Sequence, residues 1–325
     1  MMKFKWGIIG TGKIAHRFAS DLKLLPEVEL VGVVSRNRES VLKFSEEFGT
    51  APYFSIEDLL SSEVEIIYIA TPHTSHKEHS LLAINAGKAV LCEKPVSINY
   101  SEAQSIIDHA KLKNVFFMEA MWTRFFPAIE EVIQLVNSGA IGKLTSIESS
   151  FGYKSNYDPA SRVFNPELGG GSLLDVGVYS VSLARMIVNE YAADIESTAI
   201  LCPTGVDESA QWKLAFHSGT NAIGRSSVKE ILQNEAIITG SRGTIRIPKF
   251  WCPKDYYFND EHREFEFPGL GFHFEASAVM SCLKNGVKEE SRLSHQHSLD
   301  VMKIMDGIVK NFESGGTSRV VPVNS

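Results

Sequence analysis

The sequence predicts an α/β protein with two domains: a parallel sheet covered by helices, and an α+β domain with a large open, mainly antiparallel sheet. Its 325 residues exceed the size at which a single core usually stops growing, roughly 250–300 residues. Short apolar runs alternate with helical spacing up to about residue 118, whereas later apolar runs follow one another with few helices between them. The first pattern is typical of parallel sheets and the second of antiparallel ones. We therefore divide the chain into residues 1–120 and 121–325.

The first domain is expected to alternate strand and helix from its start. Near-continuously apolar runs predict five strands, at 4–9, 30–34, 64–70, 89–92 and 115–118. Helical spacing predicts four helices between them, at 13–25, 39–48, 75–86 and 101–113. Ser55 is a suitable N-cap for a further short helix, IEDLL. Strands that are apolar throughout are buried on both faces, so helices should cover both sides of this sheet.

The second domain is expected to begin with a helix at 128–137 and then to consist mainly of strands. Strand-like runs occur at 144–151, 195–201, 211–216, 221–228, 235–239 and 244–247. One long helix, 172–189, interrupts them, and a last helix, 298–312, could pack on either domain. Successive strands without helices between them favour antiparallel pairing.

The composition argues against three other classes of protein. With a formal net charge of −7 and no basic run, the chain lacks the electrostatic footprint of a nucleic-acid-binding protein. No apolar run approaches the ~20 residues that a membrane span needs. The four cysteines, Cys92, Cys202, Cys252 and Cys282, form no CxxC pair, so neither a zinc site nor a disulfide framework is implied. We expect a cytoplasmic protein with no nucleic-acid or membrane partner.

The first strand leads into the string GTGKIA, which has the pattern G-x-G-x-x-A of a dinucleotide-binding turn. Gly10 allows the tight turn, Gly12 lets the backbone approach a pyrophosphate, and Ala15 permits close packing of helix on strand. The helix N-terminus then offers N–H groups to the phosphates. The sequence therefore predicts that residues 1–120 form a Rossmann dinucleotide-binding domain. Its loop contacts would be Gly10, Thr11, Gly12, Lys13 and Ile14.

The end of the second strand favours NADP over NAD. An NAD site usually has an Asp or Glu there, which binds the ribose 2′-hydroxyl. This chain has no acid at that point and instead carries Ser35, Arg36 and Arg38. A hydroxyl with two guanidinium groups suits a 2′-phosphate, which Arg binds bidentately. NAD stays possible.

Two further segments carry residues with the chemistry of a site. Histidines 73, 76 and 79 follow the third strand at three-residue spacing, but no neighbouring Cys or Asp completes a metal site, so we expect no metal and place this loop beside the cofactor. Farther along, Asp175 and Tyr179 are four residues apart and share one helix face. Gly177 between them costs a helix about 1 kcal/mol relative to Ala. We infer that something comes close to this face.

These motifs occur in the same order as in the Gfo/Idh/MocA oxidoreductases, which the chain resembles essentially from end to end. The shared motifs are Gly10–Ala15, Thr71-Pro72 with His76, Glu93-Lys94-Pro95 and Gly169–Tyr179. The string EAMWTRFFP at 119–127 is most similar to the dimeric trans-dihydrodiol dehydrogenase and D-xylose dehydrogenase branch. Many sugar and inositol dehydrogenases of the family have histidine where this chain has Tyr179. The dihydrodiol branch has tyrosine, which weakens an inositol assignment.

The resemblance implies a Rossmann domain followed by a domain with a large open sheet, and it assigns roles to site residues. Lys94 would reach into the active site, with a cis peptide bond before Pro95, and Glu93 would help to hold the nicotinamide end of the cofactor. Arg162 would also contact the cofactor. The loop after the third strand would line the cofactor through Thr71, Pro72, His73 and His76.

We therefore predict an NADP-dependent dehydrogenase or reductase that transfers a hydride between NADP(H) and a small polyhydroxylated substrate, a sugar or a trans-diol. Tyr179 would be the acid/base, because the ammonium group of Lys94 can lower a tyrosine pKa from its ordinary value of about 10. Asp175 would orient either the substrate hydroxyl or Lys94. The substrate pocket wall would include Trp122, Arg124 and Phe125.

Two alternatives within the family remain open. NAD-dependent glycosidases oxidise their substrate transiently and hydrolyse it with no net change in cofactor. Non-catalytic cofactor- or sugar-sensing regulators use the same fold, but such a protein could dispense with Lys94, Asp175 and Tyr179. Residues 121–325 are expected to bind substrate and to form a homodimer or higher homo-oligomer, because their many strands have few helices to cover both faces of the sheet.

Overall fold

The computed structural model describes residues 3–313, which form two compact units. The first unit contains the chain up to Ser97, residues 101–122 and residues 267–295. The second unit contains residues 98–100, 123–266 and the described residues from 296 onward. Each unit has its own sheet, and the chain passes from the first unit to the second and back.

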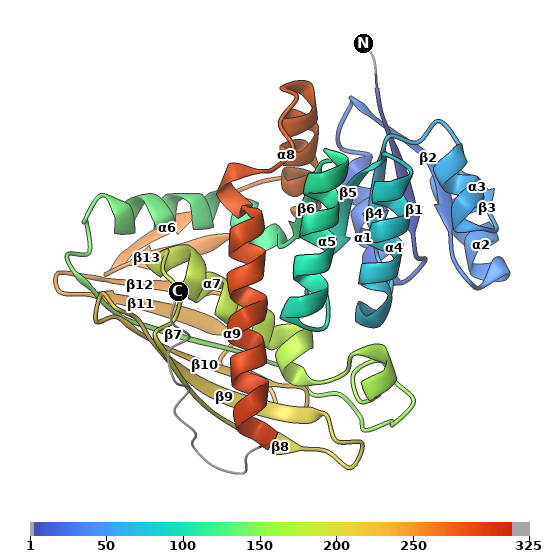
Figure 1. Ribbon diagram of the computed structural model, residues 1–325. Helices are drawn as coiled ribbons and strands as arrows, with labels where there is room; N and C mark the ends of the chain where they lie inside the picture. The colour runs from blue at the N-terminus through green and yellow to red at the C-terminus, as the bar shows by residue number, and fades with distance from the viewer. Residues whose placement is uncertain (1–2, 314–325) are drawn as a thin grey trace. The chain divides into compact units, whose positions relative to one another are not determined.

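The first unit is a doubly wound parallel sheet of six strands in the order β3-β2-β1-β4-β5-β6 (Figure 1). The strands are β1 (Phe4–Ile9), β2 (Val28–Val34), β3 (Ala51–Tyr53), β4 (Ile66–Ile69), β5 (Ala89–Glu93) and β6 (Phe117–Ala120). The helices between them are α1 (Lys13–Leu22), α2 (Arg38–Phe48), α3 (Ile56–Ser61), α4 (His76–Asn85) and α5 (Tyr100–Lys113). From β1 the sheet first grows on one side through β2 and β3, and then on the other side through β4, β5 and β6. The strand order therefore reverses between β1 and β4. Ligands bind at such a point in open α/β sheets.

Apolar side chains on both faces of this sheet make its core. The last four residues of β1 and all of β4 and β5 are buried. On one face, the Phe18 ring stacks on Tyr68 with centroids 3.6 Å apart and also contacts Trp6. Burial on both faces explains why these strands read as continuous apolar runs, as the sequence predicted.

The segment 267–295 adds helix α8 (Phe272–Lys284) and the 3₁₀ turn η5 (Ser291–Leu293) to the first unit. The Asp21 carboxylate at the end of α1 accepts backbone N–H groups from Leu270, Gly271 and Phe272 at 2.8–3.0 Å. Asp21 thereby satisfies the first donors of a helix some 250 residues away. Sequence reasoning missed α8, because its buried positions include His273 and Glu275 and its apolar stripe is therefore interrupted.

The second unit is built on an eight-stranded sheet in the order β14-β13-β12-β11-β7-β10-β9-β8. Its strands are β7 (Leu144–Gly152), β8 (Asp194–Leu201), β9 (Asp207–Ala215), β10 (Asn221–Ser227), β11 (Glu235–Gly240), β12 (Thr244–Pro248), β13 (Asp255–Phe258) and β14 (Glu261–Glu264). Only β7 and β10 pair in parallel, and all other neighbours pair antiparallel. The predicted fold class, with its large and mainly antiparallel second sheet, is confirmed.

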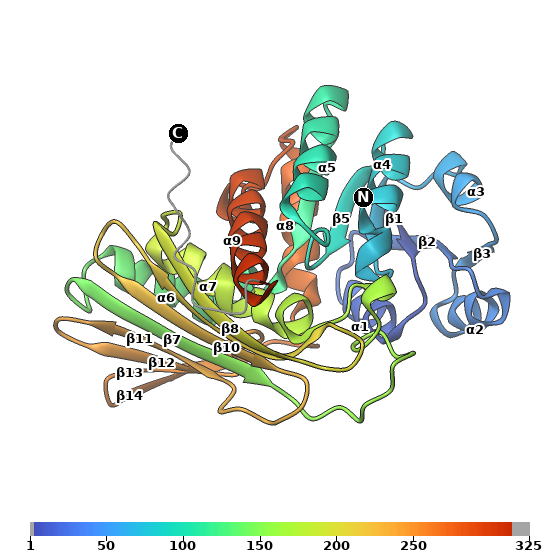
Figure 2. The same cartoon turned by 60° about the horizontal axis from the view of Figure 1, so that its bottom comes forward.

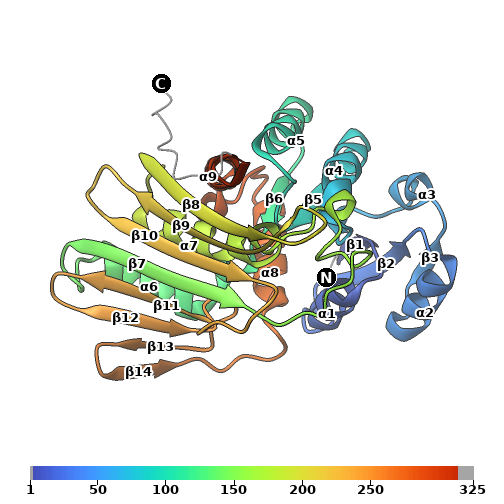
Figure 3. The ribbon, with the colours of Figure 1, turned by 90° about the horizontal axis from the view of Figure 1, so that it is seen from below.

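Helices cover one face of this sheet. They are α6 (Pro127–Asn137), α7 (Val178–Val188) and α9 (His295–Glu313). Figure 3 shows the other face, with α6 and α7 behind the strands. The inner face packs closely, since a Cβ on Gly224 of β10 would lie 2.2 Å from the Trp212 ring of β9. No helix covers the outer face within residues 3–313.

The last helix, α9, packs on the second unit, which answers a question that the sequence left open. Arg185 of α7 pairs with Asp300 of α9, with Nε to Oδ2 at 2.8 Å. The Asn311 amide donates to Ile195 O at 3.0 Å, which ties the far end of α9 to β8. α9 therefore packs across α7 (Figure 1, Figure 2).

One helical stretch of the described chain, Pro166–Val188, has the length and hydropathy of a membrane span. It contains α7, and 83% of it is buried inside the structure.

Candidate active site

The glycine-rich loop after β1 has the geometry of a phosphate-binding turn. Gly10 has a φ of +118°, and its N–H donates to Val34 O at 2.8 Å. A Cβ on Gly10 would lie 2.4 Å from Ala70 O, so only glycine fits there. Gly12 is the N-cap of α1, and a Cβ on it would meet no atom within 4 Å. The loop therefore leaves open space in front of the first N–H groups of α1.

The other predicted loop contacts lie beside this space. Thr11 Oγ1 is 2.8 Å from Ser40 Oγ in the first turn of α2, so the glycine loop contacts the segment after β2. Lys13 is exposed and Ile14 is half-buried at the start of α1.

The segment after β2 carries the residues predicted to bind the 2′-phosphate. Ser35 is half-buried, and Arg36 and Arg38 are exposed. The Arg38 guanidinium lies over the Phe54 ring, with Cζ 3.9 Å from the ring centroid. Stacking of this kind orients the guanidinium plane while it leaves N–H donors at its edge.

The loop after β4 is fixed by His76. Its Nδ1 lies 2.8 Å from Pro95 O, and its Nε2 lies 3.0 Å from Thr71 O. The ring is fully buried, and burial lowers the pKa of His76 to about 4. A neutral ring has one N–H and can donate to only one of these carbonyl groups. His76 therefore lies between the Thr71 loop and Pro95 and donates its one N–H to one of the two carbonyl groups.

The remaining predicted residues of this loop lie around His76. Pro72 precedes the 3₁₀ turn η1 (His73–Ser75), and His73 is buried within it. The His79 Nδ1 lies 3.1 Å from Thr71 Oγ1. Across residues 3–313 no group of three or more His, Cys, Asp or Glu side chains is arranged to hold a metal ion.

The charged pair at the end of β5 is held by buried partners. The Tyr68 hydroxyl donates a short hydrogen bond to Glu93 Oε1, and the Lys94 N–H donates to Glu93 Oε2 at 3.2 Å. Burial raises the pKa of Glu93. The Lys94–Pro95 peptide bond is cis, as predicted. The Val96 N–H, which follows it, donates to Glu119 Oε1 at 3.0 Å.

Three of these segments converge at one edge of the sheet. Gly10 follows β1, Thr71 follows β4, and Glu93 ends β5, and these three strands are adjacent and parallel. Their carboxyl ends therefore bring the glycine loop, the His76 loop and the Glu93-Lys94 pair together, beside the point where the strand order reverses.

In the second unit, Asp175 lies in a π-helical turn, η4 (Leu173–Gly177), that opens α7. The Val178 N–H donates to Leu173 O, five residues back. Such turns are rare and are often found at functional sites.

The cap of this turn comes from another strand. Ser172 occupies the N-cap position, but its hydroxyl makes no cap hydrogen bond and donates to Asp207 Oδ2 at 2.7 Å. Asp207 itself accepts the Leu173 N–H at 2.8 Å, so β9 supplies the cap. Sequence reasoning missed Asp207, because it lies 34 residues from the N–H that it satisfies.

Both oxygens of the Asp175 carboxylate have partners within the second unit. The Tyr153 hydroxyl donates to Oδ2 at 2.5 Å, and Arg162 Nη2 donates to Oδ1 at 2.9 Å. Burial, followed by the negative charge of Asp175, raises the pKa of Tyr153 well above its ordinary value. Tyr153 therefore stays protonated and remains a hydrogen-bond donor.

The close approach inferred from Gly177 is made by the sheet. A Cβ on Gly177 would lie 3.1 Å from the Trp212 ring of β9 and 3.2 Å from Ser226 Oγ of β10. Packing of α7 on the sheet thus explains this glycine.

Tyr179 belongs to an aromatic cluster in the second unit. It is 8% exposed, and its ring centroid is 5.8 Å from that of Phe151. Phe151 stacks on Trp251, with centroids 3.7 Å apart and an angle of 9° between the planes. The Thr123 hydroxyl donates to Trp251 O at 2.8 Å, which holds the Trp251 backbone in place.

The residues predicted to form the pocket wall fall in both units. Trp122, in the first unit, stacks on Phe272 with centroids 4.2 Å apart. Arg124, in the second unit, is buried and pairs with Glu130 at 2.9 Å, and Phe125 is 4% exposed.

Sequence reasoning missed four residues around Asp175 and Tyr179, namely Phe151, Tyr153, Asp207 and Trp251. Phe151 and Tyr153 flank the end of the strand predicted at 144–151, and aromatic residues at a strand end would have been the available signal. Asp207 and Trp251 gave no comparable signal, because their partners lie far away in the sequence.

Comparison with known proteins gives similarity along nearly the whole chain. Residues 4–121 match the model of the oxidoreductase family with an NAD-binding Rossmann fold, and residues 129–246 match the GFO/IDH/MocA C-terminal domain. The chain is 36% identical to the trans-1,2-dihydrobenzene-1,2-diol dehydrogenase of Danio rerio, over 94% of this chain and 96% of that protein. It is 31% identical to the Homo sapiens protein of that name, over 95% of this chain and 97% of that protein.

Solved structures share the fold at lower identity. The aldose-aldose oxidoreductase of Caulobacter crescentus has a TM-score of 0.88 at 23% identity and covers 98% of this chain and 100% of its own. A 3-ketoreductase of Actinomadura kijaniata, in complex with NADP and TDP-benzene, has a TM-score of 0.85 at 24% identity. The similarity covers 95% of this chain and 98% of that protein. A levoglucosan dehydrogenase, in complex with NADH and L-sorbose, has a TM-score of 0.88 at 20% identity. The similarity covers 99% of this chain and 100% of that protein.

Proposed function

The chain belongs to the Gfo/Idh/MocA family of oxidoreductases, and from this premise we propose that it is an NADP-dependent dehydrogenase that acts on a small vicinal diol or sugar. One observation carries the proposal. The glycine loop, the His76 loop and the Glu93-Lys94 pair lie at the carboxyl ends of three adjacent parallel strands, β1, β4 and β5. The named relatives, which are trans-1,2-dihydrobenzene-1,2-diol dehydrogenases, support a diol as the substrate class.

The residues present fit a dinucleotide cofactor. The open space in front of Gly12 is where a pyrophosphate would lie, and no side chain fills it. Residues 35–38, which directly follow β2, contain no carboxylate to bind a 2′-hydroxyl, while Ser35, Arg36 and Arg38 offer a hydroxyl and two positive charges. When bound, the cofactor would accept or give the hydride. We propose that it is NADP, with NAD as a poorer alternative.

For the proton, we propose Tyr179. A carbinol that loses hydride must also lose its hydroxyl proton, and a tyrosinate is a competent base if its pKa is brought toward neutral pH. The ammonium group of Lys94 would lower that pKa and would bind the reacting oxygen. Tyr153 is unsuited to this role, because burial and the Asp175 charge raise its pKa. Asp175 would hold the substrate, and Trp122 would form part of the wall that excludes water.

The experiment that tests the function is a substrate panel. Purified protein is assayed by NADPH absorbance with aldoses, anhydro-sugars and trans-diols in the oxidative direction, and with the matching hydroxyketones in the reductive direction. We expect cofactor-dependent turnover of at least one class, with a stoichiometric change in NADPH. Substrate consumption with no net change in NADPH would instead indicate a glycosidase, and cofactor binding without turnover of any substrate would indicate a sensor.

We also propose that the protein is a homo-oligomer that uses the outer face of the second sheet. A depression of about 570 Å³ lies on this face, and Ile223, Ile231, Leu232 and Ile237 contribute its apolar lining. Ile231 is 75% exposed and Ile223 is 37% exposed. Glu148 and Arg225 line the same depression, so a second copy could add charged pairs around an apolar centre.

We place the protein in the cytoplasm. All four cysteines are free thiols in the structure, as is usual in a reducing compartment.

A further inference from the structure

Glu275 is a fully buried acid in the first unit, and no assignment above uses it. It lies in α8, one helical turn after Phe272, and its exposed fraction is 0%. Within residues 3–313, neither of its carboxyl oxygens has a hydrogen-bond partner. A polar group buried in this way costs stability, and a leucine of similar size would avoid that cost. The acid at this position therefore indicates a function.

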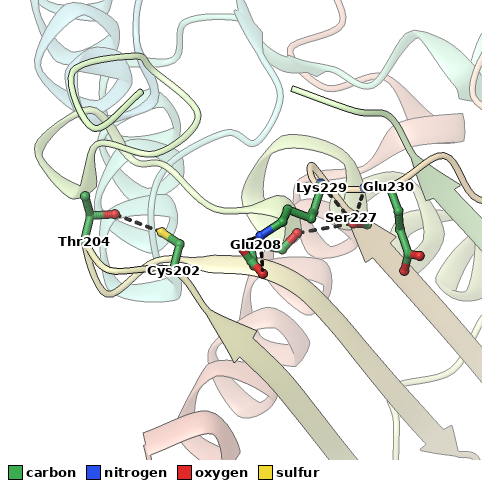
Figure 4. A network of polar contacts seen from close by, with 6 residues as sticks. All are labelled: Cys202, Thr204, Glu208, Ser227, Lys229 and Glu230. Carbon is green, nitrogen blue, oxygen red and sulfur yellow. Dashed lines mark hydrogen bonds and ion pairs between the residues drawn. The ribbon is translucent and has the colours of Figure 1, made fainter. Parts of the chain in front are cut away.

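Two other largely buried carboxylates show what Glu275 lacks. In the second unit, Figure 4 shows Glu208, whose two carboxylate oxygens both accept from Lys229 Nζ, at 3.0 Å and 2.9 Å. In the first unit, the Asp21 carboxylate accepts three backbone N–H groups at the start of α8. Each of these carboxylates is held by donors that favour its ionised form, and Glu275 has no such donor.

A continuous series of contacts links the helix that carries Glu275 to Glu93. The Phe272 and Phe18 rings have centroids 6.1 Å apart, and Phe18 stacks on Tyr68. The Tyr68 hydroxyl donates to Glu93 Oε1. The series leads from α8 past α1 to the carboxyl end of β5, which is the edge of the sheet where the cofactor is proposed to bind.

The surroundings of Glu275 keep its proton in place. Burial raises the pKa of Glu275 well above its ordinary value, and the negative charges of Glu93 and Asp21 raise it further. The other titratable group at this end of α8 is His273, whose Nδ1 lies 3.6 Å from Asp21 Oδ2. Glu275 is therefore a neutral carboxylic acid, with one O–H to donate.

Glu93 is the better placed of the two acids to carry a negative charge. Burial raises the pKa of Glu93, but the Tyr68 hydroxyl and the charge and N–H of Lys94 oppose that rise. The charge of Glu119 adds to it. Two neighbouring acids avoid a double negative charge when one of them holds a proton. The proton therefore belongs on Glu275 and the negative charge on Glu93.

We propose that Glu275 is a positioning residue for Glu93, to which its carboxyl group donates a hydrogen bond through one buried water molecule. No direct hydrogen bond joins the two side chains in the described part of the chain, and a water molecule is the bridge that suits two buried polar groups. The bridge would keep Glu93 ionised. This inference rests on the proposed function, because Glu93 lies at the edge where the cofactor is proposed to bind.

The topology of the sheet puts Glu93 toward the nicotinamide end of the proposed complex. The pyrophosphate is proposed to bind after β1 and the 2′-phosphate after β2, so the other half of the dinucleotide would extend over β4 and β5. Glu93 is the last residue of β5. The nicotinamide ring is positively charged in NADP⁺ and uncharged in NADPH, so an ionised Glu93 favours the oxidised form. The ratio of the NADPH to the NADP⁺ dissociation constant measures this preference, since both forms share the phosphates.

The test follows this ratio against pH in the unmutated protein, in Glu275→Leu and in Glu275→Gln. Fluorescence titrations between about pH 5 and pH 8 give both dissociation constants, and the ratio should fall at low pH as Glu93 takes up a proton. Leucine removes the donor, so we expect the fall in Glu275→Leu to begin about one pH unit higher. Glutamine is neutral and keeps an N–H donor, so Glu275→Gln should follow the unmutated protein.

Infrared spectroscopy tests the proton itself, with no cofactor added. An ordinary glutamate is ionised at pH 7, whereas a protonated carboxyl group has its own C=O stretching band. We expect such a band in the unmutated protein and its loss in Glu275→Gln. Glu46→Gln, at an exposed glutamate of α2, is the matched control and should change neither the band nor the ratio. Urea unfolding separates loss of the donor from loss of fold, and Glu275→Leu should be at least as stable as the unmutated protein.

Three results would overturn the inference while the proposed function stands. They are an unshifted ratio in Glu275→Leu, an equal shift in Glu275→Leu and Glu275→Gln, and an infrared band that Glu275→Gln retains in full. Binding of neither NADP⁺ nor NADPH by the unmutated protein would instead reject the proposed function, and with it the inference that rests on it.

Discussion

At the scale of single residues, Tyr153 and Tyr179 carry the same side chain and differ by environment. Tyr153 donates to a carboxylate in a half-buried position, which raises its pKa and keeps its proton in place. Tyr179 lies at the start of α7 beside the Phe151 ring. The Asp175 carboxylate therefore makes Tyr153 a fixed donor, whereas Tyr179 is the proposed acid/base.

The role of Tyr179 can be measured directly. Tyr179→Phe should lower kcat by about 10²–10⁴-fold, the usual contribution of acid–base catalysis, which corresponds to roughly 2.7–5.5 kcal/mol of barrier. Lys94→Ala should be at least as damaging, and the double variant should be little worse than Lys94→Ala alone, if the two residues act as a unit as proposed. Single-turnover kinetics with NADPH titration and thermal unfolding would check this. Retention of more than half of kcat would reduce Tyr179 to a packed aromatic.

Arg36 is the residue that should decide the choice of cofactor. Arg36→Ala removes a charge-assisted contact of roughly 1.5–3 kcal/mol, so the NADP dissociation constant should rise about tenfold to 150-fold. The dissociation constant for NAD should hardly change. Arg263→Ala, an exposed site on β14 with the same change of charge, is the control for fluorescence titrations. Equal affinities of the unmutated protein for NADP and NAD would refute the assignment.

At the scale of elements, the π turn η4 depends on a cap from another strand. Asp207 accepts the Leu173 N–H and the Ser172 hydroxyl, and a Cβ on Gly171 would lie 2.3 Å from Asp207 Oδ1. Gly171, with a φ of +111°, therefore lets the chain pass against the carboxyl group. Asp207 thus fixes where the turn that carries Asp175 begins.

Asp207 should also make stability depend on pH. Burial raises its pKa from 3.8 to about 6, so the folded protein binds more protons than the unfolded chain between these values. Its contribution to the free energy of unfolding is therefore most favourable below pH 4. That contribution is lost as the pH rises through 6, by up to roughly 3 kcal/mol. Asp207→Asn should remove this loss of stability at higher pH. Urea unfolding of both proteins at pH 4.5 and pH 7 measures the difference, and parallel changes in the two proteins would contradict it.

The sequence predicts elements well where the pattern is local. The strand Phe4–Ile9, the turn at Gly10 and the Ser55 cap of α3 agree with the structure, because periodicity and capping act within a few residues. Strands β3, β13 and β14 were missed, since they are only three or four residues long, and β3 and β14 are also largely exposed. The partners of Asp175 and the cap of η4 depend on residues brought together by folding, so local spacing cannot reveal them.

At the scale of the whole molecule, the outer sheet face should determine assembly. The chain has a mass of 36.0 kDa, and a homodimer would have about twice that mass. Ile231→Asp should shift the protein toward the monomer, because it places a charge at an exposed apolar position of the proposed interface. Leu112→Asp on α5, where the side chain is 79% exposed, is the control. Light scattering that gives a monomer for the unmutated protein at micromolar concentration would reject the proposal.

The bond between Asp21 and the start of α8 has a consequence for synthesis on the ribosome. Asp21 emerges early, but its partners Leu270, Gly271 and Phe272 are translated about 250 residues later. At roughly 5–20 residues per second, Asp21 waits on the order of 12–50 s for these partners. During that interval the Phe18 ring lacks its contact with Phe272. The first unit thus begins to leave the exit tunnel first, but it is completed only when α8 has been translated. Until then, the surface that α8 will cover is exposed and available to a nascent-chain chaperone.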